Sequence, residues 1–306
     1  MPVTGVHAVV VSFQPDWQRL AAQFERLTGQ VDRIVWVDNG SADRIRRSDG
    51  PWAHERVHPI WLDTNRGLGH AQNLGIEWAR GQGASHVLLM DDDSLPQPGM
   101  VAALLDALAH DKHAAAAGPF YWDPRRAARD VFFRTRNGRM RRHACEGDAS
   151  VVDVDYTIAS GCLIPSAFFD RVGLMREDFF IEWIDVEWCL RAHARGHRVL
   201  GVCAARLEHR LGDRMVRVGR REFPLHPPWR HYYQARNFVL MLRGVELDAL
   251  TRWRYTLRQL ARFLFFSTWP ARRTSYLRMW LLGLAHGLRG QSGAAIRPGA
   301  GAAAES

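Results

Sequence analysis

The first hundred residues alternate short apolar runs with segments of helical spacing, and this pattern restricts the fold more than any other feature. Four apolar runs predict buried strands, at residues 6–13, 34–37, 60–62 and 87–90. Two segments between them predict helices, at residues 16–28 and 69–80. Strands that alternate with helices predict an α/β fold, in which helices flank both faces of a parallel sheet.

Polar residues follow three of these predicted strands. Ser12 ends the first, Asp38 and Asn39 follow the second, and an acidic run at 91–93 follows the fourth. The carboxyl ends of parallel strands lie at one edge of a sheet, and ligands bind outside that edge. The sequence therefore predicts a binding site there.

The rest of the chain has parts of different character. Residues 123–148 are arginine-rich and irregular, which predicts a mobile loop or insertion over the sheet. Strand signals return at residues 156–165 and 199–203, and helix signals lie between them at residues 168–172 and 184–195. Aromatic residues, leucine and arginine dominate after residue 224 and predict several helices. We expect an α/β catalytic domain, a C-terminal helical extension and a disordered Gly/Ala-rich tail, at residues 1–223, 224–289 and 290–306 respectively.

The charge balance indicates phosphate-bearing ligands. The chain has 41 Lys and Arg against 32 Asp and Glu, a net charge of +9. Arginine supplies nearly all of the positive charge, which can equally reflect the base composition of a genome. A basic chain favours phosphates on nucleotides, nucleic acid or anionic lipid. We expect no nucleic-acid partner, because carboxylates cluster at the strand ends and no nucleic-acid-binding module is recognisable.

The cysteines and the apolar segments bear on the compartment. The chain has four cysteines, Cys145, Cys162, Cys189 and Cys203. They form no CxxC pair, so we expect free thiols in a reducing cytoplasm rather than a structural zinc site. No run of about 18 apolar residues predicts a spanning helix, and the start of the chain lacks the pattern of a signal peptide.

Asp91, Asp92 and Asp93 are the strongest chemical signal. Three consecutive carboxylates repel one another unless a cation neutralises them. Because side chains alternate along an extended chain, Asp91 and Asp93 should point to the same side. Two carboxylate ligands suit Mg²⁺ or Mn²⁺, which keep open positions for phosphate oxygens. The alternative is a solvated acidic turn, or the N-cap of a helix predicted at residues 96–107.

Two glycine-containing loops are candidates for nucleotide contacts. The sequence DNGS at residues 38–41 combines a carboxylate with backbone amides, although the same residues make a good turn. The sequence NRGLG at residues 65–69 precedes a predicted helix, and a helix N-terminus beside glycines favours anions. The second loop is neither a Walker loop nor a GxGxxG motif.

Three later segments carry further candidates. Asp185 and Glu187 lie in FFIEWIDVEWCLR, where they could supply a general base or only stabilise a helix N-terminus, and Glu182 is a rival for the base. His209 follows a predicted strand and is either a metal ligand or a structural histidine. Arg236 lies in WRHYYQARN, which could bind a diphosphate or form an amphipathic helix.

In order along the chain, eight segments resemble the inverting family 2 glycosyltransferases of the GT-A fold, and in particular a rhamnosyltransferase branch of bacterial polysaccharide enzymes. They cover roughly residues 6–240 and read VVVSFQPD, VDRIVWVDNGSAD, NRGLGHAQNLGIEWA, LLMDDDSLP, SGCLIP, FFIEWIDVEWCLRAHARGHRV, LEHRLGD and HYYQARN. The resemblance implies a Rossmann-like, mixed and mainly parallel sheet flanked by helices, with a C-terminal helical extension.

In that family an aspartate pair after a strand binds the metal, and a D-x-E element supplies the catalytic base. The resemblance implies a site for Mg²⁺ or Mn²⁺ formed by Asp91, Asp93 and His209. It further implies that Asp185 is the base, and that Glu187 and Trp183 contact the acceptor.

The resemblance also implies a nucleotide-sugar site. The end of the first strand and the aspartate after the second would contact a thymine or uracil base through Ser12, Phe13 and Asp38. The other expected donor contacts are Asn39, Gly40, Asn65, Gly67, Asn73, Asp91, Asp92 and Arg236. The first strand ends in SFQPD, where Gln14 departs from the asparagine that is frequent in the family. Backbone contacts should tolerate this change.

The implied reaction is an inverting single displacement with oxocarbenium character. We expect transfer of L-rhamnose from dTDP-L-rhamnose onto a glycan or polyprenyl-linked acceptor during synthesis of a bacterial surface polysaccharide. The alternatives are a UDP-sugar donor, as in galactofuranosyl- and glucosyltransferases, and a non-catalytic sugar-binding relative.

The C-terminal helices have two interpretations. Their arginine-rich and aromatic composition suits helices that lie on the cytoplasmic face of the inner membrane, which a lipid-linked acceptor would favour. The same helices could instead pack on the catalytic domain or form a dimer interface.

Overall fold

The computed structural model describes residues 3–42, 50–125, 132–136, 139–145, 150–209, 214–218, 221–268 and 273–296. The chain divides into two compact units. The first consists of Met1–Met175 and Asp185–Leu211, and the second of Arg176–Ile184 and Gly212–Ser306. The division differs from the predicted boundary at residue 223, because the short segment 176–184 belongs with the C-terminal helices.

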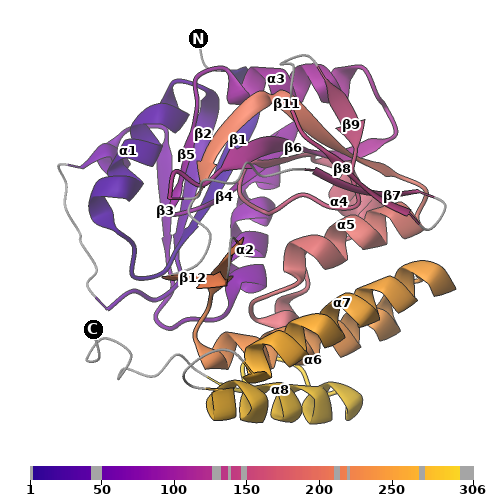
Figure 1. The fold of residues 1–306 in the computed structure, drawn as a ribbon. Helices are drawn as coiled ribbons and strands as arrows, with labels where there is room; N and C mark the ends of the chain where they lie inside the picture. The colour runs from indigo at the N-terminus through magenta and orange to yellow at the C-terminus, as the bar shows by residue number, and fades with distance from the viewer. Residues whose placement is uncertain are drawn as a thin grey trace. The chain divides into compact units, whose positions relative to one another are not determined.

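A mixed sheet of nine strands lies at the centre of the first unit (Figure 1). Its strands are β1 Val3–Ser12, β2 Val31–Asp38, β3 Val57–Trp61, β4 His86–Asp91, β5 Ser94–Pro96, β6 Ala114–Trp122, β9 Val151–Asp153, β10 Cys162–Pro165 and β11 Arg198–His209. The order is β3-β2-β1-β4-β10-β6-β11-β5, and β9 also pairs with β11. β1, β2, β3 and β4 pair in parallel, as do β6 and β11, whereas β5, β9 and β10 pair antiparallel.

Helices cover both faces of this sheet (Figure 1). They are α1 Trp17–Thr28, α2 Leu68–Gly81, α3 Met100–Ala109, α4 Ala167–Val172 and α5 Ile184–Ala194, with a short 3-10 helix at Pro51–Ala53. Side chains of β1 alternate between the two faces, and Val6, Ala8 and Val10 pack in the core with residues of α1 and α3. Val9 points to the opposite face and contacts Gly75 of α2, where an added Cβ would lie 2.3 Å from Val9 Cγ1. The predicted α/β class is confirmed.

Three predicted elements have different bounds. The helix expected at 96–107 begins at Met100, because residues 94–96 pair with β11 as β5. The strand expected at 156–165 is confined to Cys162–Pro165. The strand expected at 199–203 continues to His209, which places that histidine at the end of the longest strand of the described residues.

The arginine-rich segment is more regular than predicted. Within its described part, β7 (Phe132–Arg136) and β8 (Arg139–His143) form an antiparallel hairpin, in which the first residue of β7 lies opposite the last residue of β8. Asp153 accepts a hydrogen bond from Arg134 of this hairpin at 2.6 Å.

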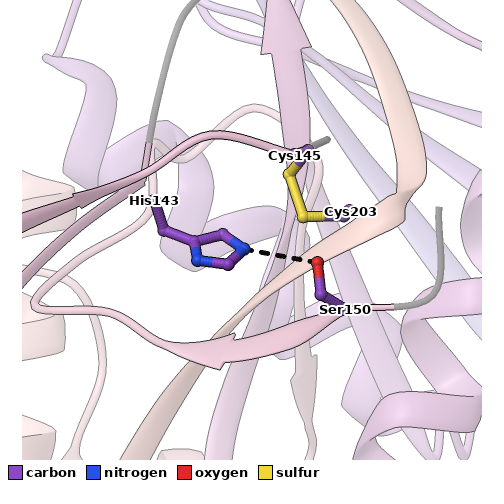
Figure 2. Close-up of a disulfide and its surroundings, with 4 residues drawn as sticks. All are labelled: His143, Cys145, Ser150 and Cys203. Carbon is purple, nitrogen blue, oxygen red and sulfur yellow. Dashed lines mark hydrogen bonds between the residues drawn. A yellow bond between two sulfur atoms is a disulfide. The ribbon is translucent and has the colours of Figure 1, made fainter. Parts of the chain in front are cut away.

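A disulfide joins Cys145 to Cys203 of β11 (Figure 2), which corrects the expectation of four free thiols. Nearby, the His143 ring lies 3.3 Å from the Ser150 hydroxyl. The two cysteines are 58 residues apart, so only the fold brings them together. Cys162 and Cys189 are free and buried. Because disulfides persist mainly in oxidising surroundings, the cysteines no longer support a reducing compartment.

Three helices form most of the second unit, namely α6 Pro228–Gly244, α7 Ala249–Thr268 and α8 Arg273–Leu288 (Figure 1). The unit also contains a 3-10 helix at Glu177–Phe179 and the strands β12 Arg214–Val218 and β13 Arg221–Leu225. Gly283 and Gly287 of α8 allow close approach to α6, because an added Cβ would lie 2.3 Å from the Tyr232 carbonyl oxygen and 2.8 Å from that of Arg236. The predicted helical extension is thus a packed helical unit.

The first part of the predicted tail packs on the helical unit. The Tyr233 hydroxyl of α6 donates to the carbonyl of Ile296 at 2.8 Å, so the chain returns to α6 after α8 ends. Residues 297–306, the rest of the predicted tail, lie outside the described residues. Across the residues that the structure describes, no helix combines the length and apolar character needed to cross a membrane.

Candidate active site

The strand register brings the predicted polar residues to one edge of the sheet. Ser12 at the end of β1 lies opposite Asp38 at the end of β2. On the other side of β1, Val11 lies opposite Asp91 at the end of β4. The three strands therefore end together, as the sequence predicted, and their carboxyl ends form the floor of the candidate site.

Asp38 organises the loop that follows β2. One carboxylate oxygen accepts from the hydroxyls of Ser12 and Ser41, at 3.2 and 2.6 Å, and the other from the amides of Gly40 and Ser41, at 3.2 and 2.8 Å. Ser12 in turn accepts from the Trp36 indole at 2.9 Å. Asp38 is only 1% exposed. Its direct contribution is therefore the shape of the loop, and the side chain predicted to contact the base is buried beneath it.

The two glycine-containing loops are bonded to each other. The Asn39 side chain donates to Asn65 at 3.2 Å and accepts from the amide of Arg66 at 2.9 Å. Gly40 has φ +85°, and an added Cβ would lie 2.5 Å from the Thr64 carbonyl carbon, so this loop requires glycine. Gly67 precedes α2, whose N-terminus has no side-chain cap. The arrangement leaves backbone amides at a helix N-terminus, which favours an anion.

The acidic run at residues 91–93, which begins at the end of β4, also contacts the residue that follows β1. The Asp92 carboxylate accepts from the amide of Phe13 at 3.1 Å. Burial, reinforced by the neighbouring Asp93 and Asp91 carboxylates, raises the pKa of Asp92 to about 7. The three neighbouring carboxyl groups therefore oppose one another's ionisation, and a bound cation would relieve this repulsion.

Asp91, Asp93 and His209 come together as a group that could hold a metal ion, with one ligand atom from each lying within 4.8 Å of the others. His209 Nδ1 is 3.1 Å from the Asp93 carboxylate. Burial by itself would lower the pKa of His209 and raise that of Asp93, but their mutual hydrogen bond and opposite charges outweigh burial and reverse both directions.

The donor set fits a divalent cation. Two carboxylates and one imidazole suit Mn²⁺. Mg²⁺ also takes carboxylate ligands but prefers sites with fewer nitrogen ligands. The predicted same-side arrangement of Asp91 and Asp93 agrees with this grouping, and His209 reaches it because β11 pairs with β5 immediately after the acidic run.

Two residues of α1 support the acidic run and were not predicted. The Gln23 amide donates to the carbonyls of Asp91 and Ser94, both at 2.6 Å. Arg19 donates to the Asp93 carbonyl at 2.5 Å and to Glu208 at 3.0 Å. Arg19 and Gln23 are four residues apart and are buried beside the apolar face of α1. In the sequence, both could have been recognised as polar residues at core-facing positions of an amphipathic helix.

Two serines connect the metal-ligand group to the segment that faces Asp185. Ser160 donates to Ser94 at 2.6 Å and accepts from the amide of Asp91 at 3.2 Å. The Ser94 hydroxyl is 2.7 Å from His209 Nδ1. These buried hydroxyls fix the histidine ring next to the acidic run. Neither serine was singled out from the sequence.

Asp185 lies in the first turn of α5 and is half-buried. Its carboxylate accepts from the amide of Ala159 at 3.3 Å and from that of Val186 at 2.8 Å. Ala159 directly precedes Ser160, so the carboxylate is one residue away from the hydroxyl pair beside His209. Asp185 also lines a small cavity with Thr157 and Cys162.

Glu187 and Asn73 have structural partners instead of the predicted ligand contacts. Glu187 is 1% exposed and forms a two-point ion pair with Arg191 at 2.9 and 3.0 Å. Arg191 also donates to the carbonyls of Val172 and Leu174. The Asn73 side chain bonds to both the amide and the carbonyl of Met175, at 2.9 and 3.0 Å. Both residues are enclosed, which argues against the predicted acceptor and donor contacts.

Arg236 and Trp183 belong to the second unit. Arg236 is fully buried, and its guanidinium bonds to the carbonyls of Asp178, Phe179 and Gly293. This corrects the expectation that it reaches a diphosphate, because these carbonyls and the Asn237 side chain occupy its donors. The Trp183 indole donates to the carbonyl of Gln234 at 3.1 Å.

The segment before Asp185 has an unusual backbone. Phe180, Glu182 and Trp183 have φ of +66°, +66° and +69°, a region that non-glycine residues rarely adopt. The Asn237 amide of α6 lies within hydrogen-bond distance of three carbonyls in this segment, those of Phe179, Ile181 and Glu182. The QARN sequence thus stabilises a strained loop.

Comparison with known proteins agrees with this geometry. Residues 8–155 match the model of glycosyl transferase family 2. The dTDP-rhamnosyl transferase RfbF of Shigella flexneri is 28% identical over 292 residues, which cover 95% of this chain and 97% of RfbF. The galactofuranosyltransferase GlfT1 of Mycobacterium tuberculosis is 29% identical over 270 residues, covering 81% of this chain and 86% of GlfT1.

Solved glycosyltransferases share the fold at low sequence identity. Residues 1–349 of S. aureus TarS, in complex with UDP-GlcNAc, superpose with a TM-score of 0.59 at 14% identity, covering 94% of this chain and 82% of that one. GalNAc-T7, solved with UDP, GalNAc and Mn²⁺, gives a TM-score of 0.56 at 12% identity, and this chain spans only 58% of its length. On these grounds the chain is a glycosyltransferase with a GT-A fold, and its residues 8–155 match the glycosyl transferase family 2 model.

Proposed function

We propose that Asp185 is the general base of an inverting, single-displacement sugar transfer. A series of contacts that connects Asp185 to His209 supports this proposal. Asp185 accepts from the amide of Ala159, the next residue Ser160 donates to the Ser94 hydroxyl, and that hydroxyl lies beside the His209 ring. An inverting reaction needs a base on one side of the sugar and stabilisation of the leaving group on the other. A half-buried carboxylate and a metal-ligand group, connected within one unit, supply both functions.

In the proposed reaction Asp185 accepts the proton of an acceptor hydroxyl. The acceptor oxygen forms a bond to the anomeric carbon, while the bond from that carbon to the donor diphosphate breaks and the diphosphate leaves with the electron pair. A divalent cation bound by Asp91, Asp93 and His209 would supply positive charge to the departing diphosphate. The amides after Gly67 would contact the same phosphates.

The proposed donor is dTDP-L-rhamnose. Its support is the similarity to RfbF over nearly the full length of both chains. A UDP-sugar is the second candidate, supported by the similarity to GlfT1. The proposed acceptor is a glycan or a polyprenyl-linked saccharide of a bacterial surface polysaccharide.

A thermal-stability panel tests the donor. The protein would be heated with dTDP, dTDP-L-rhamnose, UDP and UDP-galactofuranose, each with Mn²⁺ or with a chelator. A ligand at a hundredfold excess over its Kd stabilises the fold by about 2.7 kcal/mol. We expect the largest metal-dependent shift with the dTDP ligands. A preference for UDP would make a UDP-sugar the donor in place of dTDP-L-rhamnose. No response to any nucleotide would contradict the proposed activity.

A further inference from the structure

The outer face of α7 exposes a continuous row of large apolar side chains. Five of them are between 44% and 59% exposed, namely Leu250, Trp253, Leu257, Leu260 and Leu264. Their spacing of three and four residues places them on one face of the helix. We call this row the α7 stripe. Five such side chains in one row exceed the scattered apolar residues of an ordinary surface.

The stripe is not the face by which α7 packs. Phe266 of α7 is buried, and its ring lies 4.5 Å from the His231 ring of α6. Phe263 packs on Trp280 of α8 at 5.6 Å. Buried Gln259 shares this inner face. The helical unit is therefore already assembled without the stripe, which stays available for another partner.

The charge of α7 and α8 decides which partner fits. The two helices contain six arginines and no acidic residue: Arg252, Arg254, Arg258, Arg262, Arg273 and Arg278. The nearest acidic residues along the chain, Glu246 and Asp248, precede α7, where Asp248 accepts from the amides of Leu250 and Thr251. Within the fold, Arg262 lies close enough to Glu182 that its charge, after that of Arg230, lowers the pKa of this carboxyl. Two copies that met through the stripe would bring together their exposed arginines, Arg252, Arg258, Arg273 and Arg278, and neither α7 nor α8 contains an acidic residue to balance them. An anionic surface would instead complement them.

We propose that α7 docks on an anionic lipid surface, with the α7 stripe in the acyl–headgroup boundary. Arg258, which follows Leu257 of the stripe, is exposed, as is Arg278 of α8. Long arginine side chains beside an apolar face extend to phosphate headgroups. Trp253 is the residue type that is enriched at such interfaces.

α8 extends the same kind of surface. Leu277, Leu281 and Leu288 are 36%, 52% and 62% exposed. α7 and α8 contact each other within the helical unit (Figure 1). Because no helix among the described residues can cross a membrane, docking would be peripheral and reversible.

Flotation of the full-length protein with vesicles tests the proposal without any measurement of sugar transfer. Wild type would be mixed with phosphatidylcholine vesicles, or with vesicles that also contain phosphatidylglycerol, at low and at high NaCl. Two variants probe the surface, Leu257→Gln with Leu260→Gln, and Arg258→Gln with Arg278→Gln. Val151→Gln is the matched control, because Val151 is 47% exposed in the first unit.

We expect wild type and the control to float with anionic vesicles and to be released by salt. The leucine variant should lose roughly tenfold in partitioning, because two half-exposed leucines would no longer enter the lipid. The arginine variant should lose affinity for anionic vesicles. Equal binding to neutral vesicles, or no flotation of wild type at low salt, would overturn the proposal. So would a leucine variant that changes only the oligomeric state.

Discussion

Asp185 and Glu187 are two residues apart on one helix but have opposite environments. Asp185 is half-buried beside a cavity, whereas Glu187 is enclosed and paired with Arg191. We therefore expect Asp185→Asn to lower kcat by about a hundredfold or more, the usual contribution of a general base. Nucleotide affinity and stability should stay close to those of wild type. Turnover near the wild-type rate in folded Asp185→Asn would exclude it as the base.

Glu187→Gln is the matched control for Asp185→Asn. It removes the negative charge that faces the Arg191 guanidinium and one of its two acceptor oxygens, so we expect a loss of about 3 kcal/mol in the free energy of unfolding. Turnover per folded molecule should be retained. Urea unfolding and single-turnover transfer, measured on both variants, separate the two roles.

At the residue scale, the sequence indicates which residues form the site better than it indicates what each of them does. The alternation rule and the strand ends were sufficient to group Asp91 with Asp93 and to place Ser12 beside Asp38. The role of Arg236 could not be predicted in the same way. Its guanidinium bonds to carbonyls of residues 178, 179 and 293, and sequence spacing does not indicate such long-range contacts.

At the scale of elements, α6 stabilises the strained loop before α5. Asn237→Ala would remove the hydrogen bonds to Phe179, Ile181 and Glu182, and positive φ at non-glycine residues costs of order 1–3 kcal/mol each. Since Ile184 leads directly into Asp185, we expect kcat to fall about tenfold or more, with nucleotide affinity unchanged.

Tyr233→Phe is the matched control on the same helix. The Tyr233 hydroxyl bonds to residues 295 and 296 and not to the loop, so its removal should lower stability without lowering kcat. Steady-state kinetics on both variants, together with nucleotide titration, is the measurement. An Asn237→Ala enzyme with unchanged kcat would show that the loop does not position the base.

The α6 helix also carries a pH-sensitive group. Burial, and secondarily the Arg262 charge, lower the pKa of His231 to about 3, and its Nδ1 accepts from the Trp280 indole at 3.2 Å. The folded state thus favours neutral His231. Stability from this group is full above the unfolded pKa of about 6.5 and falls as the pH drops from there toward 3.

At about pH 5 the loss from His231 amounts to about 2 kcal/mol, since each pKa unit corresponds to about 1.4 kcal/mol. His231→Asn does not titrate, so its stability should fall less steeply between about pH 7 and about pH 5. Chemical unfolding of wild type and variant at both pH values is the measurement. Equal pH slopes would mean that His231 is protonated in the folded protein.

The elements themselves were largely predictable, and their ends were not. Strong periodicity located β1, α1, β2, α2 and β4. The helix expected at 96–107 began late, because the pairing of β5 with β11 overrides local helical preference. The hairpin of β7 and β8 was missed because arginines dominate its composition.

At the scale of the whole molecule, the two units have different tasks. The first unit contains the candidate site at the carboxyl ends of the strands. The second contains the exposed α7 stripe and the loop that leads to Asp185. The sequence indicated a helical extension, but the assignment of residues 176–184 to it depends on contacts with α6 that no local pattern encodes. The same holds for the Cys145–Cys203 disulfide.

We expect Asp91, Asp93 and His209 to bind the metal through which the protein recognises a nucleotide diphosphate. Calorimetric titration of dTDP into wild type and Asp93→Asn, with and without Mn²⁺, tests it most directly. We predict that Mn²⁺ strengthens dTDP binding to wild type about tenfold or more and has little effect on the variant. Equal metal dependence in the two proteins, or binding that ignores Mn²⁺ altogether, would contradict the claim.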